Sequence, residues 1–454
     1  MTDTMQHRIE RRGRTALAWA ASDAGATWAF RIALAISAVV YWVVGRRQWF
    51  IRDDWAFLLS RQALRVTRGI DDWLLTAQDG HWMTPPLLIF RGLQNLFGMG
   101  SYWPYLVVNL VLHVGAVLLT RRLCQRWGVS PWTTTLLCSI LLVFGGGWMN
   151  IVFAVQITYN LSLVCFLAQV LLADHDGPVD RRDWLGAAAG VLGVMSSGFG
   201  PFFIAGMAAL LVLRGRWKAA AVAVLPQGLA YAWWYLTWAS DIASDIVPGP
   251  RSQVPAFAVR GLTATFESLI AIPALGAVAL LGALAMVFTP ALTRQVRTGL
   301  AAMWVTATLM FLGIGVQRIG FGVQSAEESR YQYMAAMVLV PAVGLAVDRL
   351  ARWSPGVHRA TQLLLVVSVV LNAGWLQVRS AEWADRSAAT RRLFELVAGS
   401  GLLDDVAPDR RIDDYNPDVN AGWLGYLVQE GVVTPRTPST PEEIAEVRRA
   451  LGLP

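Results

Sequence analysis

Apolar stretches close to the length of a membrane-spanning helix alternate with shorter polar segments along most of the chain. A helix needs roughly 20 apolar residues to cross about 30 Å of hydrocarbon, and about eleven stretches approach that length. They cover residues 27–45, 103–120, 131–147, 153–173, 184–198, 201–214, 219–238, 266–289, 300–316, 332–348 and 361–378. The pattern predicts an all-α polytopic membrane protein.

The fifth and sixth stretches are shorter than the others. A Ser-Ser-Gly-Phe-Gly-Pro sequence from Ser196 to Pro201 separates them. Glycine and proline interrupt helices, so the pair is either two short helices or one broken or re-entrant element.

The composition agrees with a membrane protein and excludes other classes. Hydrophobic residues make up 55% of the chain and charged residues 15%, which is more apolar than a soluble domain. The pI is near 9.6, but the basic residues lie in short loops between apolar stretches, so nucleic-acid binding is not indicated. Cys124, Cys138 and Cys165 show neither disulfide nor zinc spacing.

The loop arginines predict the orientation. With eleven spans, one side receives the arginines of the N-terminal tail together with Arg121, Arg122, Arg126, Arg214, Arg216, Lys218, Arg294, Arg297, Arg349, Arg352 and Arg359. The positive-inside rule makes that side cytoplasmic in a plasma (inner) membrane. We therefore expect a cytoplasmic tail (1–26), a transmembrane domain (27–378) with a long first outer loop (46–102), and a small extracytoplasmic C-terminal segment (379–454).

The first outer loop is predicted to contain an amphipathic helix. Between Trp55 and Trp73, one helical face is apolar and the other carries Arg61, Arg65 and Arg68. Such a helix lies in the membrane interface, where its arginines can hold an anionic lipid.

Asp53 and Asp54, two adjacent carboxylates directly after the first span, are the clearest candidates for chemistry. On a helix the two side chains point about 100° apart, so we expect only one to face a central cavity. His81 lies in a Gly- and Pro-containing turn of the same loop and either approaches the carboxylates or caps a turn.

Two further outer segments carry polar groups. Asn150, Gln156 and Asn160 follow a triple-glycine tract and either bind a hydroxyl-rich ligand or join neighbouring helices. The Glu327-Glu328-Ser329-Arg330-Tyr331 segment precedes the tenth span. Its arginine either grips a phosphate, with Tyr331 beside it, or anchors the helix at the interface.

The C-terminal segment is polar and contains Thr440-Pro441-Glu442-Glu443, a capping box that predicts a short helix running toward Leu451. We expect this segment to pack on the outer loops, as a stabilising cap or as a lid.

The acidic pair after the first span, the interfacial helix, the tract from Gly147 to Leu161, the Ser197-Gly198 break and the late Ser329-Arg330-Tyr331 together resemble the GT-C superfamily of integral-membrane glycosyltransferases. The resemblance implies a polyprenyl-phosphate-linked sugar donor and a glycan, lipid or protein acceptor. It implies that Asp53 or Asp54 is a general base or metal ligand, and that Arg330 contacts the donor phosphate.

The chemistry of the residues is compatible with that role. A lipid phosphate is a good leaving group, so the reaction chiefly needs a carboxylate that deprotonates the acceptor hydroxyl. If a divalent cation such as Mg²⁺ or Mn²⁺ takes part, Asp53 and Asp54 with Glu327 or Glu328 can supply its oxygen ligands.

Two other function classes fit part of the pattern. A transporter or flippase would place ionisable groups near the bilayer midplane and often shows repeated halves, whereas here the charges gather near the outer surface and no repeat is visible. A non-catalytic assembly subunit would use the Asp53-Asp54 pair only as an interfacial cap.

Overall fold

The computed structural model describes residues 22–239 and 247–454 as helices and loops, with two isolated β-bridges. Most of the expected N-terminal tail lies outside the described residues. The bundle helices are α2 (Asp23–Gly45), α7 (Trp103–Arg126), α8 (Pro131–Leu142), α9 (Trp148–Val152), α10 (Ile157–Ala173), α11 (Arg181–Val194), α12 (Gly200–Leu213), α13 (Trp217–Trp238), α14 (Val254–Ile270), α15 (Pro273–Met286), α16 (Arg294–Arg318), α17 (Ser329–Ala351) and α18 (Pro355–Gly399).

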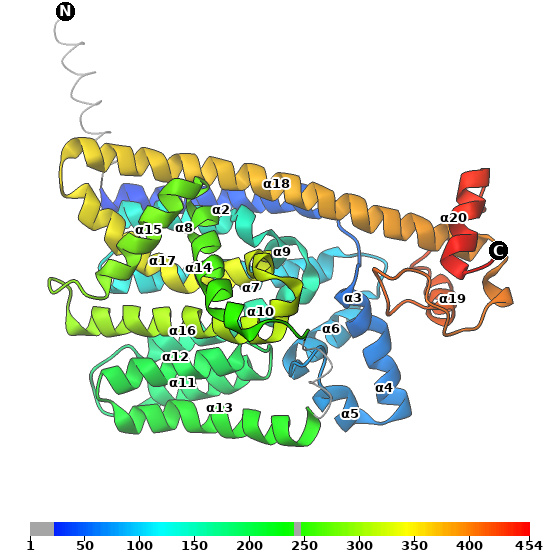
Figure 1. The fold of residues 1–454 in the computed structure, drawn as a ribbon, viewed down its shortest axis with the longest axis horizontal. Coiled ribbons are helices and arrows are strands. Elements are labelled where there is room, and N and C mark those ends of the chain that lie inside the picture. The colour runs from blue at the N-terminus through cyan, green and yellow to red at the C-terminus, as the bar shows by residue number, and fades with distance from the viewer. Residues whose placement is uncertain (1–21, 240–246) are drawn as a thin grey trace, which may run out of the picture.

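Shorter helices lie at one end of this bundle (Figure 1). The first loop forms α3 (Asp53–Trp55), α4 (Arg61–Thr67), α5 (Ile70–Leu75) and α6 (Thr84–Phe97), and the C-terminal segment forms α19 (Ala421–Gln429) and α20 (Pro441–Leu451). The first loop and the C-terminal segment therefore share one end of the molecule.

The predicted apolar stretches coincide with helices, and the polytopic helical class is confirmed. Among the described residues, seven helices are long and apolar enough to cross a membrane, or up to eight if one bent pair counts as a span. This is fewer than the expected eleven, because helices such as α12 are apolar but short. The break after the fifth stretch is confirmed, since α11 and α12 are separate helices.

The eighth predicted stretch, 266–289, is not one straight helix. It contains the end of α14 and all of α15, which meet at an angle of 113°. Ala271, between them, has a left-handed backbone with φ of 59°, and Pro273 begins α15. Proline at this position ends one helix and starts the next.

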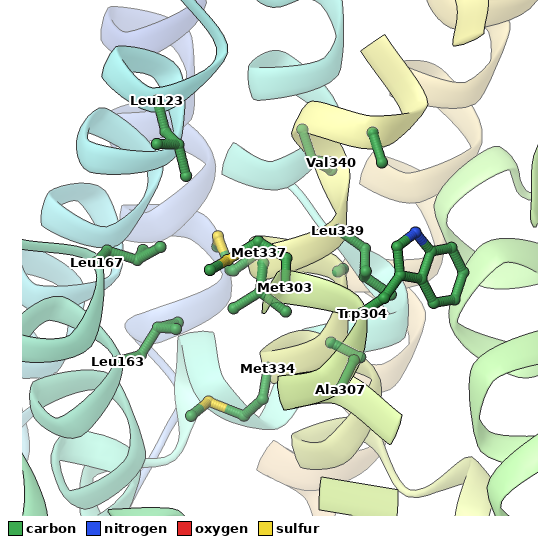
Figure 2. Packing of buried hydrophobic residues seen from close by; sticks show 14 of the residues in the cluster. Leu123, Leu163, Leu167, Met303, Trp304, Ala307, Met334, Met337, Leu339 and Val340 are labelled. Atoms are coloured by element: carbon green, nitrogen blue, oxygen red, sulfur yellow. The ribbon is translucent and has the colours of Figure 1, made fainter. Parts of the chain in front are cut away.

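Helix α17 lies at the centre of the bundle. Its residues are buried from Ser329 to Leu345 with almost no interruption. Figure 2 shows Met334 and Met337 of this helix among side chains from its neighbours, which include Leu163 of α10 and Met303 of α16. This packing fixes the position of the N-terminal turn of α17, which contains Arg330.

The basic loops meet at the other end of the bundle. Buried Asp174, after α10, forms ion pairs with Arg126 at the end of α7 and with Arg214 after α12, the latter at 2.6 Å. Gln295 at the start of α16 also donates to Asp174, at 3.3 Å. The loops expected to be cytoplasmic therefore share one face.

The first outer loop is helical but differs from the expected single amphipathic helix. A π-helical turn (Ala56–Ser60) precedes α4, and Gly69, with φ of 108°, separates α4 from α5. A π-turn changes the residue spacing, so a face drawn at 100° per residue does not continue through it. Trp55 and Val66, expected on one apolar face, differ accordingly: Trp55 is buried inside the protein, whereas Val66 is 87% exposed.

The C-terminal segment packs on the first loop, as expected. Helix α18 continues without interruption past residue 379 and carries the segment beyond the bundle (Figure 1). Leu424 and Leu451 of the segment join one apolar cluster with Trp49 and Trp55 of the first loop. Thr440 caps α20 by accepting a hydrogen bond from the Glu443 N–H, at 3.2 Å.

Candidate functional site

A pocket beside α3 collects polar side chains from separate parts of the chain. We call it the Asp53 pocket, and its lining includes Asp53, Asp79, His81, Gln156, Thr158, Tyr159, Arg318 and Arg330. An adjoining pocket, lined by Tyr331 and Gly198 among others, shares His81, Tyr159 and Arg318 with it. The structure thus brings together the sequence-predicted residues Asp53, His81, Gln156 and Arg330, with Tyr331 next to them.

The carboxyl group of Asp53 faces this pocket in a mixed electrostatic environment. Burial is the largest cause that raises its pKa, and the Asp79 carboxylate adds to the increase. The guanidinium groups of Arg318 and Arg330 oppose it by stabilising the charged form. A carboxylate with a raised pKa and free access to a pocket is suited to take a proton.

Asp54 is placed differently from Asp53. Its side chain is fully buried, and its two oxygens accept hydrogen bonds from the N–H of Ile51, at 3.2 Å, and of Val155, at 3.1 Å. The Tyr102 hydroxyl is a further hydrogen-bond partner. Burial raises the pKa of Asp54 well above the ordinary range. This carboxyl joins the first loop to the turn before α10 and does not line the pocket.

The backbone around Asp53 is strained. Arg52, directly before it, has φ of 54°, a conformation that residues other than glycine rarely adopt. Asp79, which also lines the pocket, has φ of 48°. Strained residues persist where the surrounding structure holds them, and they concentrate at functional sites.

His81 is presented by a tight turn. Asp79 and Gly80 both have positive φ, and the backbones of Gln78 and His81 bond to each other on either side of them, as in a two-residue hairpin. The ring lies against Gly198, where an added Cβ would be 2.1 Å from Nδ1. Burial and the nearby arginines lower the pKa of His81 to about 4, so the ring is neutral at neutral pH.

The three outer amides separate into two groups. Asn150 and Asn160 bond to each other, at 3.2 Å, and Asn160 bonds to Asn109 of α7, at 2.8 Å, so these side chains join helices. Gln156 lines the pocket instead, and its buried Oε1 has no hydrogen-bond partner. An unpaired buried acceptor of this kind is suited to a ligand hydroxyl.

Arg330 lies in the first turn of α17. Its guanidinium is 5.2 Å from the ring centre of Tyr331 and forms an ion pair with Glu328, at 3.2 Å. Its Nε is buried and has no hydrogen-bond partner. A donor is therefore available for an anionic ligand.

The structure does not bring Arg61 and Arg65 to the Asp53 pocket. Arg61 is buried and donates to main-chain carbonyls of Trp73 and Thr76, so it fastens α4 to α5. Burial lowers its pKa to about 10. Arg65 is exposed and lies over the Trp73 ring, with 5.4 Å to the ring centre.

The structure does not gather into one site the four acids that were expected to be possible metal ligands, Asp53, Asp54, Glu327 and Glu328. Glu327 bonds to Arg260, at 2.7 Å, and lines a different pocket from Asp53. Glu328 pairs with Arg330. Within residues 22–239 and 247–454, the only three-residue group with metal-like spacing is His175, Asp180 and Asp183, at the basic end, where Arg216 already pairs with Asp183.

Several residues of the pocket were not identified from sequence. Arg318 ends α16 and brings a second guanidinium to the pocket, and Tyr159 comes from α10. The sequence places Arg318 at the outer end of an apolar stretch, which could have indicated a site residue. Arginines that only anchor a helix at the membrane interface occupy the same position, so the pattern did not single it out.

Comparisons with known proteins identify the fold. No protein-family model matches the sequence, and a search of curated proteins finds no match. Among solved structures, ArnT from Cupriavidus metallidurans in the apo state is similar, with a TM-score of 0.54, 13% identity, and 90% of each chain covered. The same protein bound to undecaprenyl phosphate gives a TM-score of 0.53 and 11% identity, covering 89% of this chain and 88% of ArnT. The chain thus has the polytopic membrane fold of ArnT, in agreement with the GT-C resemblance of its sequence.

Proposed function

We propose that this protein is a membrane glycosyltransferase that moves a sugar from a polyprenyl-phosphate donor to a hydroxyl group of a glycan, lipid or protein acceptor. One observation carries the proposal. Asp53, His81, Gln156 and Arg330 come from four segments of the chain and line one pocket. The fold around that pocket is shared with a protein solved with undecaprenyl phosphate.

Asp53 is the proposed general base. The acceptor hydroxyl enters the pocket and gives its proton to the Asp53 carboxylate as its oxygen attacks the anomeric carbon. The bond between that carbon and the phosphate oxygen breaks, and the electron pair leaves with the lipid phosphate. One displacement of this kind inverts the configuration at the anomeric carbon.

Arg330 and Arg318 are the proposed phosphate-binding groups. Their positive charge lines the same pocket and offsets the negative charge that grows on the leaving phosphate. Neutral His81 and the free Oε1 of Gln156 can position hydroxyl groups of the sugar or the acceptor. Desolvation in a buried pocket strengthens each of these interactions.

The proposed orientation follows from the two ends of the bundle. The end that gathers Arg126, Arg214 and Arg216 around buried acids faces the cytoplasm of the inner membrane. The Asp53 pocket and the C-terminal segment then face the extracytoplasmic side. Labelling of single cysteines introduced near Glu430 and near Arg352, with a membrane-impermeant reagent in intact cells, tests this assignment.

Transfer in membranes that contain the natural acceptors tests the activity. Membranes with and without the protein are incubated with radiolabelled polyprenyl-phosphate sugars, and new glycosidic products are quantified. We expect Asp53→Asn to reduce transfer by about 10²- to 10⁴-fold. Asp385→Asn is the matched control, because this exposed aspartate pairs with exposed Arg47. Movement of the lipid-linked sugar across the membrane without a new glycosidic bond would contradict the proposal and support a carrier.

A further inference from the structure

A second pocket lies on another face of the first turn of α17. We call it the Glu267 pocket, because Glu267, Glu327, Trp148, Trp375 and Arg379 contribute to its lining. Ser329 and Gln332 of α17, three residues apart on one helical face, also line it. Arg330, on a different face, lines the Asp53 pocket instead. The two pockets are therefore separate sites.

The Glu267 pocket is built at a strained junction. Ala271, with φ of 59°, lines it at the bend between α14 and α15. Gly145 and Gly146 form another wall of the pocket. A Cβ added at Gly145 would lie 2.5 Å from the Cβ of Trp375, and one added at Gly146 would lie 2.6 Å from the Cβ of Ser268. Among the described residues other than glycine, Ala271 is the only one with positive φ outside the first loop. Strained residues that close packing holds in place concentrate at ligand-binding and other functional sites.

The charge of the pocket selects the kind of ligand. Glu267 and Glu327 both bind the same guanidinium, that of Arg260, at 3.0 and 2.7 Å. One positive charge is shared by two carboxylates, so this side of the pocket keeps a net negative charge. On the other side, Arg379 lies over the Trp375 ring and pairs with exposed Glu382. A cation is favoured near the two glutamates, and an anion is favoured only near Arg379.

The surroundings of the pocket place it at the depth of lipid headgroups. Trp375 is 55% exposed and Arg379 follows it by one helical turn, a pairing typical of the end of a membrane span. Apolar side chains of the adjacent helices point outward, including Val370 of α18 and Val278 and Leu281 of α15. These exposed faces can contact acyl chains directly below the pocket.

We propose that the Glu267 pocket binds the headgroup of a phosphatidylethanolamine molecule. The ammonium group donates hydrogen bonds to Glu267 and Glu327, and the phosphate lies beside Arg379. The acyl chains follow the apolar faces of α15 and α18. A lipid whose headgroup is only a phosphate is disfavoured by the two carboxylates, so this site differs in selectivity from the Asp53 pocket and does not depend on the proposed activity.

Lipid binding to the purified full-length protein tests the proposal. The delipidated protein in detergent is mixed with phosphatidylethanolamine, phosphatidylcholine or phosphatidylglycerol, and bound lipid is measured by native mass spectrometry. We expect phosphatidylethanolamine to bind about tenfold more tightly than phosphatidylcholine, because a trimethylammonium group cannot donate hydrogen bonds. In E267Q/E327Q that preference should disappear. Glu395→Gln, on α18 and paired with Arg391, is the control that should retain it.

A second variant keeps the test decisive if the double variant does not fold. Arg379→Gln removes the phosphate contact, so it should weaken phosphatidylethanolamine and phosphatidylcholine equally and preserve their ratio. Equal binding of these two lipids by the unmodified protein would overturn the proposal. So would displacement of phosphatidylethanolamine by undecaprenyl phosphate at this pocket.

Discussion

The main-chain N–H of Arg52 donates a hydrogen bond of 2.6 Å to Oδ1 of Asn416, 364 residues later in the chain. Asn416 is fully buried and donates to Asp413, at 2.7 Å, and to Thr390 of α18, at 3.2 Å. Arg52 is the strained residue directly before Asp53. The C-terminal segment therefore holds the backbone that presents the proposed base.

Replacement of Asn416 is expected to affect catalysis through Asp53. Asn416→Ala removes the acceptor for the Arg52 N–H and relaxes the strained turn. We expect kcat to fall by roughly 10- to 100-fold, because small displacements of a catalytic group are costly. Asn416→Asp retains an acceptor oxygen for the Arg52 N–H but places a second carboxylate against Asp413, so it should recover only part of the activity. A loss in both variants that follows only the amount of folded protein would contradict a positioning role.

Replacing each of the two adjacent aspartates by asparagine should affect the stability of the protein differently. Asp54→Asn leaves one acceptor oxygen for the two N–H groups of Ile51 and Val155, so the free energy of unfolding should fall by about 1–3 kcal/mol. Asp53→Asn removes a carboxyl group whose burial disfavours its charge, and stability should be unchanged or higher. Thermal unfolding of both purified variants in one detergent measures the difference. A larger loss in Asp53→Asn would contradict it.

Transfer should depend on pH through Asp53. Its pKa is raised, and the base acts only when deprotonated, so kcat/KM should decrease as pH falls through a value above about 4, the ordinary range of aspartate. His81, with a pKa of about 4, stays neutral between pH 5 and 8. His81→Gln should therefore leave unchanged the pH at which kcat/KM falls on the acidic side of the profile. A shift of that pH in the variant would identify His81 as the titrating group.

The close approach of Gly198 to His81 predicts a selective effect of one methyl group. In Gly198→Ala the new Cβ would lie 2.1 Å from Nδ1, so the ring must move out of the pocket, and we expect activity to fall by about tenfold or more. Gly228→Ala on α13 is the matched control, because no atom lies within 4 Å of its added Cβ. Initial rates at equal protein content compare the two variants, and equal rates would contradict the prediction.

The sequence was most informative about features that depend on neighbouring residues. Apolar stretches predict helices because hydrocarbon requires internally satisfied backbone hydrogen bonds over a set length. The helix at Pro441–Leu451 was predicted for a similarly local reason, since the Thr440 side chain accepts a hydrogen bond from the N–H of Glu443 one turn later. The first-loop helix was predicted less well, because neither the π-turn nor the left-handed backbone at Gly69 follows from apolar spacing.

Residue types and their distances from the ends of spans were enough to nominate Asp53, Asp54, His81, Gln156 and Arg330. Which aspartate faces the pocket depended on a partner distant in the chain, because Val155 binds the Asp54 carboxyl and leaves Asp53 free. The separation of Glu327 from Asp53 likewise depended on Arg260, which holds Glu327 in the other pocket. Helices form from local hydrophobicity and hydrogen bonding, whereas a site forms from long-range packing that brings distant side chains within contact distance.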